Sequence, residues 1–72
     1  MTEERKQHIT LQLDAHNISL NVPMSKEHLY RKAAEKINQR YKYYQRIAPN
    51  RSAEQIWVYV ALDIAVNLCA GE

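Results

Sequence analysis

Cysteine and glycine are almost absent from this sequence: Cys69 is the one cysteine and Gly71 the one glycine among 72 residues. A lone cysteine cannot form an internal disulfide, which fits a reducing compartment. Because its neighbours are apolar, Cys69 is expected to be a small buried apolar residue. A single glycine excludes a glycine-rich loop that cradles phosphates.

Segments typical of export or membrane insertion are also missing. The first seven residues are mostly charged or polar and lack the apolar core of a signal peptide. The longest apolar run is interrupted by Asp63 and Asn67 and is too short to span a bilayer comfortably. We therefore expect a cytoplasmic protein that does not enter a membrane.

Patterns that would support catalysis or metal binding are not found. The spacings of His8, His16 and His28 match no zinc pattern, so these residues are expected to be turn and surface histidines. No constellation of nucleophile and base is present, and a chain this short has little room for a preformed pocket. We therefore predict a protein that is not an enzyme and has no cofactor and no metal site.

Charge is distributed unevenly along the chain. The net charge of +2 is the sum of −1 for residues 1–25, +6 for residues 26–51 and −3 for residues 52–72. The middle segment therefore presents a positive potential, which favours an acidic partner.

Two stretches, residues 9–13 and 18–22, alternate between apolar and polar side chains. This period of two predicts half-buried strands, and the residues Asp14 to Asn17 between them suit a turn. We predict a β-hairpin over residues 8–22, after a flexible N-terminus at residues 1–7. Its apolar face needs a cover, because an isolated hairpin is marginally stable.

Helical signals follow the hairpin. Ser25 is a plausible N-cap for a helix over residues 25–47, and Ser52 starts a second helix that runs to about residue 70, with Gln55 at the capping-box position. The result is an α+β fold in which a hairpin is followed by two helices, β-β-α-α, in a single domain over residues 8–72. The first helix carries an apolar stripe that is expected to cover the hairpin: Leu29, Ala33, Ile37, Tyr41 and Tyr44.

The second helix is apolar on nearly every side, and such a helix is normally buried all round. One hairpin and one helix can cover roughly half of it, and the rest exceeds the apolar surface that soluble monomers usually expose. We therefore predict an intertwined homodimer with this helix at the two-fold interface. The interface residues form two stripes with spacing 4-3-4: Trp57, Ala61, Ile64 and Leu68, and Val58, Leu62, Ala65 and Cys69.

Asp63 and Asn67 are the plainly polar residues of this helix and lie four positions apart. One interpretation is that they meet solvent or the first helix. The other is that Asn67 faces its symmetry mate and fixes the register of the two helices.

A basic face lies opposite the apolar stripe of the first helix. It includes Lys36, Arg46 and the aromatic Tyr43, and the residues Arg51 and Glu54 of the following segment could extend it. Such a face is either merely solvated or a docking patch, because an exposed tyrosine among cations suits an acidic protein partner.

The ordered combination of these features resembles the globular head of the ZapA family of bacterial cell-division proteins. The resemblance covers roughly residues 8–70 and rests on the following stretches: Ala33-Ala34, Ile37-Asn38-Gln39-Arg40, Ala53-Glu54-Gln55-Ile56 and Ala61-Leu62-Asp63-Ile64-Ala65. One departure is the hairpin turn, where the family usually has a glycine and this chain has Ala15-His16.

The resemblance implies a protein that binds the GTPase FtsZ at the division site, bundles its protofilaments and stabilises the division ring. It also implies dimerisation through the head, and tetramerisation through a coiled coil that extends the apolar helix. Because this sequence ends at Glu72, we expect the dimer, and a tetramer only where that coiled coil is extended. Arg40 and Glu54 lie in matching motifs and join the residues expected to bind FtsZ.

The alternative is a small dimeric nucleic-acid-binding protein of the ribbon-helix-helix kind, with which the sequence pI of about 8.8 is compatible. That fold has one strand where two are predicted here. The strands carry polar residues with almost no cations to reach bases or phosphates, so nucleic-acid binding is not expected.

Overall fold

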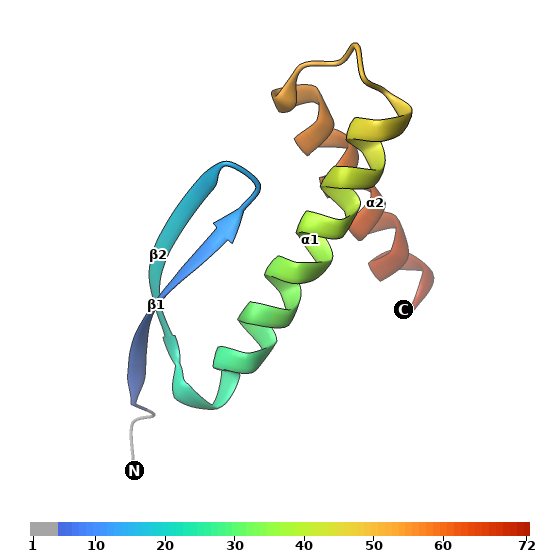
Figure 1. Ribbon diagram of the computed structural model, residues 1–72. Helices are drawn as coiled ribbons and strands as arrows, with labels where there is room; N and C mark the ends of the chain where they lie inside the picture. The colour runs from blue at the N-terminus through green and yellow to red at the C-terminus, as the bar shows by residue number, and fades with distance from the viewer. Residues whose placement is uncertain (1–4) are drawn as a thin grey trace. The chain divides into compact units, whose positions relative to one another are not determined.

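The computed structural model describes residues 5–72 and contains two strands and two helices (Figure 1). Their order is β1 (Lys6–Leu13), β2 (His16–Pro23), a 3-10 turn η1 (Met24–Lys26), α1 (Glu27–Ile47) and α2 (Ala53–Ala70). The predicted α+β fold with the order β-β-α-α is confirmed.

The N-terminal segment that was predicted to be flexible, residues 1–7, lies only partly within the described residues. Residues 1–4 lie outside the described residues, whereas Lys6 and Gln7 already belong to β1. The chain divides into two compact units, one ending at Asn38 and the other spanning Gln39–Glu72, so α1 contributes residues to both.

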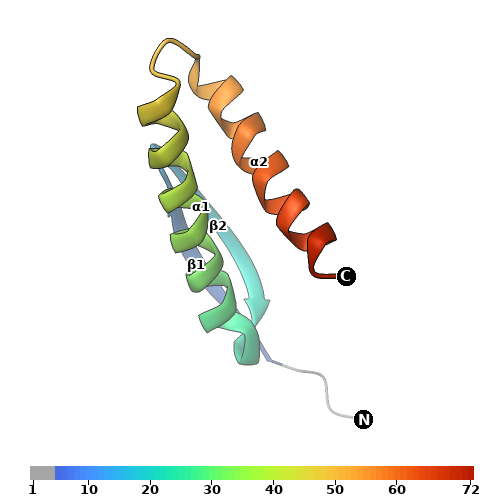
Figure 2. The same ribbon diagram turned by 90° about the vertical axis from the view of Figure 1, so that its right-hand side faces the viewer.

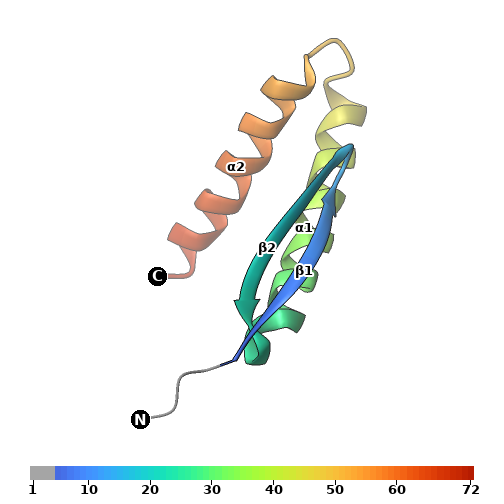
Figure 3. The same cartoon turned by 90° about the vertical axis from the view of Figure 1, so that its left-hand side faces the viewer.

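The two strands of the first unit run side by side as a hairpin (Figure 3), and their alternating sequence gives the hairpin a polar face and an apolar face. β1 and β2 pair antiparallel, with Ile9 opposite Leu20 and Thr10 opposite Ser19. On the polar face the hydroxyls of Thr10 and Ser19 are hydrogen-bonded at 3.1 Å, and His8 Nδ1 lies 3.1 Å from Asn21 Oδ1. Cross-strand contacts of this kind help to fix the register of two strands.

The turn of the hairpin is held by a side chain from α1. Asp14 has a φ of 55°, in the left-handed region that aspartate tolerates better than most residues. The Asn38 amide donates from Nδ2 to the Gln12 carbonyl oxygen at 2.8 Å, and its Oδ1 accepts from the Asp14 N–H at 2.7 Å. Asp14 and Asn38 together therefore form this turn without a glycine.

The core of the first unit contains Ile9, Val22 and Ala34, all buried. The predicted apolar stripe of the first helix is wrong at its N-terminal end, because Leu29 and Ala33 are exposed. A two-stranded sheet is too narrow to cover a wide helical stripe, and the small Ala34 is the position that is buried. The expected N-cap, Ser25, lies inside η1 rather than at the start of α1.

The second unit is a helical hairpin formed by residues 39–47 of α1 and by α2 (Figure 2). Ser52 is the N-cap of α2, as predicted, and its side chain accepts a hydrogen bond from the Gln55 N–H at 3.2 Å. The buried residues are Tyr41, Ile56 and Val60. The face of α2 that carries Ile56 and Val60 therefore packs in the core of this unit.

Candidate functional site

Asp63 is the centre of a polar network inside the helical hairpin. Its carboxylate accepts from the Tyr44 hydroxyl at 2.6 Å and from Asn67 Nδ2 at 2.9 Å. It also pairs with Arg40, whose Nε lies 3.3 Å from Oδ1. Three donors therefore converge on one carboxylate, and two of them come from α1.

The hydrogen bonds of the network favour the ionised form of Asp63 and the protonated form of Tyr44. The hydrogen bond from Tyr44 lowers the pKa of Asp63, and the Arg40 guanidinium adds to this, whereas burial acts in the opposite direction. The same hydrogen bond raises the pKa of Tyr44 above its usual 10.0. At neutral pH the pair therefore consists of an ionised Asp63 and a protonated Tyr44.

This geometry bears on the two interpretations of Asp63 and Asn67. Asp63 faces α1, and the Asn67 amide donates to Asp63 of its own chain. The first interpretation, contact with the first helix, is the one that these bonds favour. The network also engages Arg40, one of the residues expected to bind a partner, within its own chain.

An exposed aromatic and cationic pair lies farther along α1. The guanidinium carbon of Arg46 lies 5.8 Å from the centre of the Tyr43 ring, within range of a cation–π interaction. Tyr43 is 47% exposed and meets Tyr44 edge-on, with ring centres 5.1 Å apart. Because Asp63 holds Tyr44, the network also supports the orientation of the Tyr43 ring.

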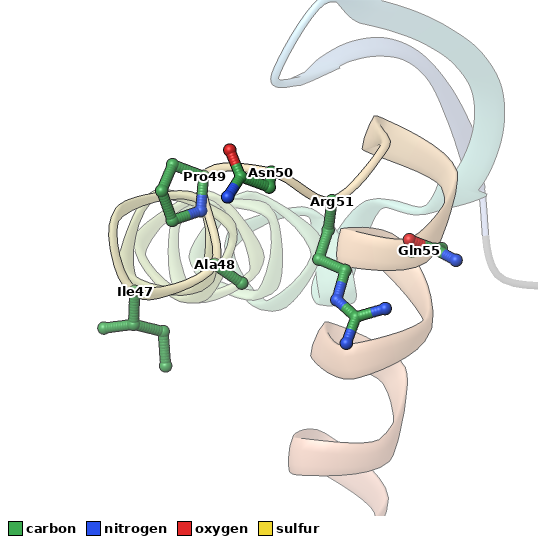
Figure 4. Close-up of a pocket in the computed structure, with 6 residues that line it drawn as sticks. All are labelled: Ile47, Ala48, Pro49, Asn50, Arg51 and Gln55. Carbon is green, nitrogen blue, oxygen red and sulfur yellow. The ribbon is translucent and has the colours of Figure 1, made fainter.

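An open depression of about 480 Å³ lies where α1 ends and α2 begins (Figure 4). Its lining combines the apolar residues of the helix end with the cation of Arg51, and Ile47 remains 55% exposed. The residues that line it are Ile47, Ala48, Pro49, Asn50, Arg51 and Gln55.

The residues expected to bind a partner are not all brought together. Tyr43, Arg46 and Arg51 lie in the second unit, at or near the connection between the helices, and Glu54 is exposed in the first turn of α2. Lys36 is exposed in the first unit. Ile47, which lines the depression, was not among the residues expected to bind a partner. The absence of any carboxylate from residue 39 to residue 53 was a sequence signal that drew attention to this region.

The residues expected at the dimer interface are mostly exposed within the single chain. Val58, Leu62 and Leu68 are 62%, 62% and 66% exposed, and Ala61 and Ala65 are also exposed. Cys69 is exposed as well, so the expectation that it is buried does not hold within one chain.

Trp57 and Ile64 differ from the other expected interface residues, because both are half-buried in the single chain. Trp57 contacts Tyr41 of the same chain, with ring centres 4.4 Å apart. The face of α2 left exposed therefore runs from Val58 through Leu62 to Cys69.

α2 also bears on the expectation about membranes. Within residues 5–72 it is the one helix long and apolar enough to cross a bilayer, contrary to the expectation that the apolar run is too short. Core helices of soluble proteins pass the same test of length and composition. No group of three or more histidine, cysteine, aspartate or glutamate residues able to hold a metal occurs in that part of the chain.

A family model described as "Cell division protein ZapA" matches residues 9–71, nearly the whole chain. No curated protein and no solved structure matches the sequence. The matched residues include most of the hairpin, both helices, Asn38 with its bonds to the hairpin turn, and the Asp63 network. The chain therefore belongs to the ZapA family, a non-enzymatic family of cell-division proteins.

Proposed function

We propose that this chain regulates cell division without catalysis, by binding FtsZ through a dimeric head and promoting the association of FtsZ protofilaments. The family acts with FtsZ in division, which makes FtsZ the first partner to test. The observation that carries the proposal is the exposed, cationic end of the helical hairpin, where Tyr43 and Arg46 lie beside one another. The proposed location is the cytoplasm, at the division site.

The exposed apolar residues of α2 support the proposed dimer. Four large apolar side chains on this helix are each more than half exposed: Val58, Leu62, Val66 and Leu68. A contiguous apolar surface of this kind marks an interaction site in soluble proteins. A second copy of α2 is the cover that we propose, because two-fold pairing is the commonest arrangement of identical chains.

A lipid bilayer is the other candidate cover for α2. Against it, Asp63 lies in the middle of the helix as an ionised carboxylate bonded to Arg40. Ionised groups are expensive at the centre of a bilayer. Sedimentation of the chain with and without lipid vesicles distinguishes the two: a dimer that does not float with vesicles supports the proposal.

The mechanism that we propose is bivalency. A dimer carries two copies of the Tyr43–Arg46 surface, and once one copy is bound the other meets the filament at a high effective concentration. Weak individual contacts then suffice to bring neighbouring protofilaments together. A tetramer would strengthen this effect and would require an extension of α2 into a coiled coil.

Co-sedimentation with FtsZ filaments at low salt tests the proposal. We expect the dimer to pellet with the filaments, and Arg46→Glu to reduce the pelleted fraction. The matched control is Lys26→Glu, which makes the same charge change at an exposed residue of the first unit. The proposal is wrong if an intact dimer fails to pellet at any FtsZ concentration.

The ribbon-helix-helix alternative receives little support. That fold contributes one strand from each chain, whereas β1 and β2 pair with each other within this chain. Titration of labelled duplex DNA at two salt concentrations tests it, because a nucleic-acid binder would show a steep dependence on salt.

A further inference from the structure

The end of the helical hairpin is unusual in its charge. Residues 39–53 contain four cationic side chains and no carboxylate. The ion pairs Arg31–Glu27 and Arg40–Asp63 involve neither Arg46 nor Arg51. The positive charges of Arg46 and Arg51 at this end of the helical hairpin are therefore not neutralised by either of these ion pairs.

Apolar and aromatic surface lies directly beside this charge. Tyr43, Arg46 and Ile47 are three and four positions apart on α1, a spacing that places them on one face of the helix. Ile47 also lines the open depression, together with Pro49 and Arg51. These five residues, Tyr43, Arg46, Ile47, Pro49 and Arg51, form one surface, which we call the loop surface.

The loop surface is also well supported from beneath. The Tyr43 ring packs edge-on against the Tyr44 ring, and the Tyr44 hydroxyl donates a hydrogen bond to the Asp63 carboxylate. The residue that packs against the exposed Tyr43 ring is thus also bonded to α2. A surface whose aromatic anchor is already oriented loses less conformational freedom when it binds a partner.

We propose that the loop surface is the docking site for an acidic peptide segment that carries one apolar side chain. The carboxylates of the segment pair with Arg46 and Arg51, and its apolar side chain packs on the Tyr43 ring and in the depression beside Ile47. This inference rests on the proposed binding of FtsZ and adds to it the chemistry of the segment of FtsZ that is bound. An aromatic residue and arginine are also the side chains most enriched among the energetic centres of protein interfaces.

A nucleic acid fits the loop surface less well than an acidic peptide does. Binding to a duplex depends strongly on the neutralisation of backbone phosphates by several cations, and this surface offers two arginines. The apolar lining near Ile47 and Pro49 has no use against a phosphate backbone, whereas it suits an aliphatic side chain.

Photo-crosslinking identifies the bound segment directly. Ile47 is replaced by p-benzoylphenylalanine, the full chain is mixed with FtsZ filaments, and the crosslinked FtsZ peptide is identified by mass spectrometry. The same replacement at His28, exposed in the first unit, is the control. We expect the Ile47 variant to crosslink to a segment that contains at least two carboxylates and an apolar residue.

Substitutions then separate the charge from the ring. We expect Arg46→Glu and Arg51→Glu each to weaken FtsZ binding about tenfold, and Tyr43→Ala to weaken it by a similar factor. Tyr43→Phe should bind as the unchanged chain does, because the ring rather than the hydroxyl makes the contact. Reversal of a carboxylate in the crosslinked segment to lysine should restore binding to Arg46→Glu. Circular dichroism and the mass in solution show that each variant is folded and dimeric.

The outcomes of these experiments distinguish this inference from the proposed function. A crosslink to a basic or uncharged segment, or the absence of any charge-swap rescue, overturns the docking inference while FtsZ binding stands. If the unchanged dimer does not pellet with FtsZ, both are overturned. If duplex DNA binds the loop surface in the nanomolar range and Arg46→Glu abolishes that binding, the surface is a nucleic-acid site and the inference is wrong.

Discussion

The Asn38 side chain offers a sharp test of how the hairpin is held. In Asn38→Ala the amide can no longer donate to the Gln12 carbonyl or accept from the Asp14 N–H, two bonds of 2.8 Å and 2.7 Å. Each such bond contributes about 1 kcal/mol net, and water can partly replace both because the turn is exposed. We therefore expect a loss of about 1–2 kcal/mol in the free energy of unfolding.

Urea denaturation followed by circular dichroism measures this loss. The comparison is made at one protomer concentration, because the stability of the proposed dimer would depend on concentration. Gln39→Ala is the matched control, since Gln39 is the exposed neighbour on the same helix, and it should change the free energy by less than about 0.5 kcal/mol. Asn38→Asp keeps an acceptor for Asp14 but sets a carboxylate oxygen against the Gln12 carbonyl oxygen, so it should be at least as destabilising as Asn38→Ala.

Hydrogen exchange locates the effect. In Asn38→Ala the amide of Asp14 should exchange much faster, while amides in the middle of α2 should change only as far as global stability does. If Asn38→Ala is as stable as Gln39→Ala, or if exchange at Asp14 does not change, the side chain does not hold the turn and the reasoning is refuted.

Further predictions concern the second unit. Ile56→Ala removes a buried side chain and should cost about 2–4 kcal/mol, measured by urea denaturation with Gln55→Ala as control; a cost below about 1 kcal/mol would show that this core is not tightly packed. Because the pKa of Asp63 is lowered on folding, its stabilisation is present above its usual value of 3.8 and is lost as the pH falls through the lowered pKa; Asp63→Asn should flatten this acid limb of thermal stability. The pKa of Tyr44 is raised instead, so its stabilisation is complete below pH 10 and is lost as the pH rises through the raised pKa, a limb that Tyr44→Phe should remove. Leu68→Glu should abolish folding rather than give a stable monomer, because it places an unpaired charge in the proposed dimer interface; sedimentation of a well-folded monomer would contradict this.

Much of the architecture could be predicted from the sequence because it depends on local patterns. Alternation of apolar and polar residues predicted the hairpin, and the structure places β1 and β2 there. Ser52 predicted the start of α2 because an N-cap acts on backbone groups within one turn. The ordered motifs around Asn38 and Glu54 predicted the ZapA family, which the match over residues 9–71 confirms.

The faces that the helices bury could not be predicted as reliably. Leu29 fits the apolar stripe of α1, yet it is exposed and the smaller Ala34 is buried. On α2, Ile56 and Val60 are buried, although the sequence offered two other apolar stripes of equal quality. A helix that is apolar on several sides has no unique inward face, so tertiary packing decides which side is buried.

The sequence by itself determined the elements, their order, the surplus of apolar surface on α2 and the concentration of positive charge before Ser52. Only the tertiary structure decided how the polar residues are used. Asn38 bonds a turn that lies 24 to 26 positions away, and Arg40 faces Asp63 at a separation of 23 positions. Local propensity carries no information about such partners, because each bond forms only when the fold brings the two groups within about 3 Å. The sequence alone therefore could not show that Arg40 pairs with Asp63, whereas Tyr43 and Arg46 are exposed on the surface.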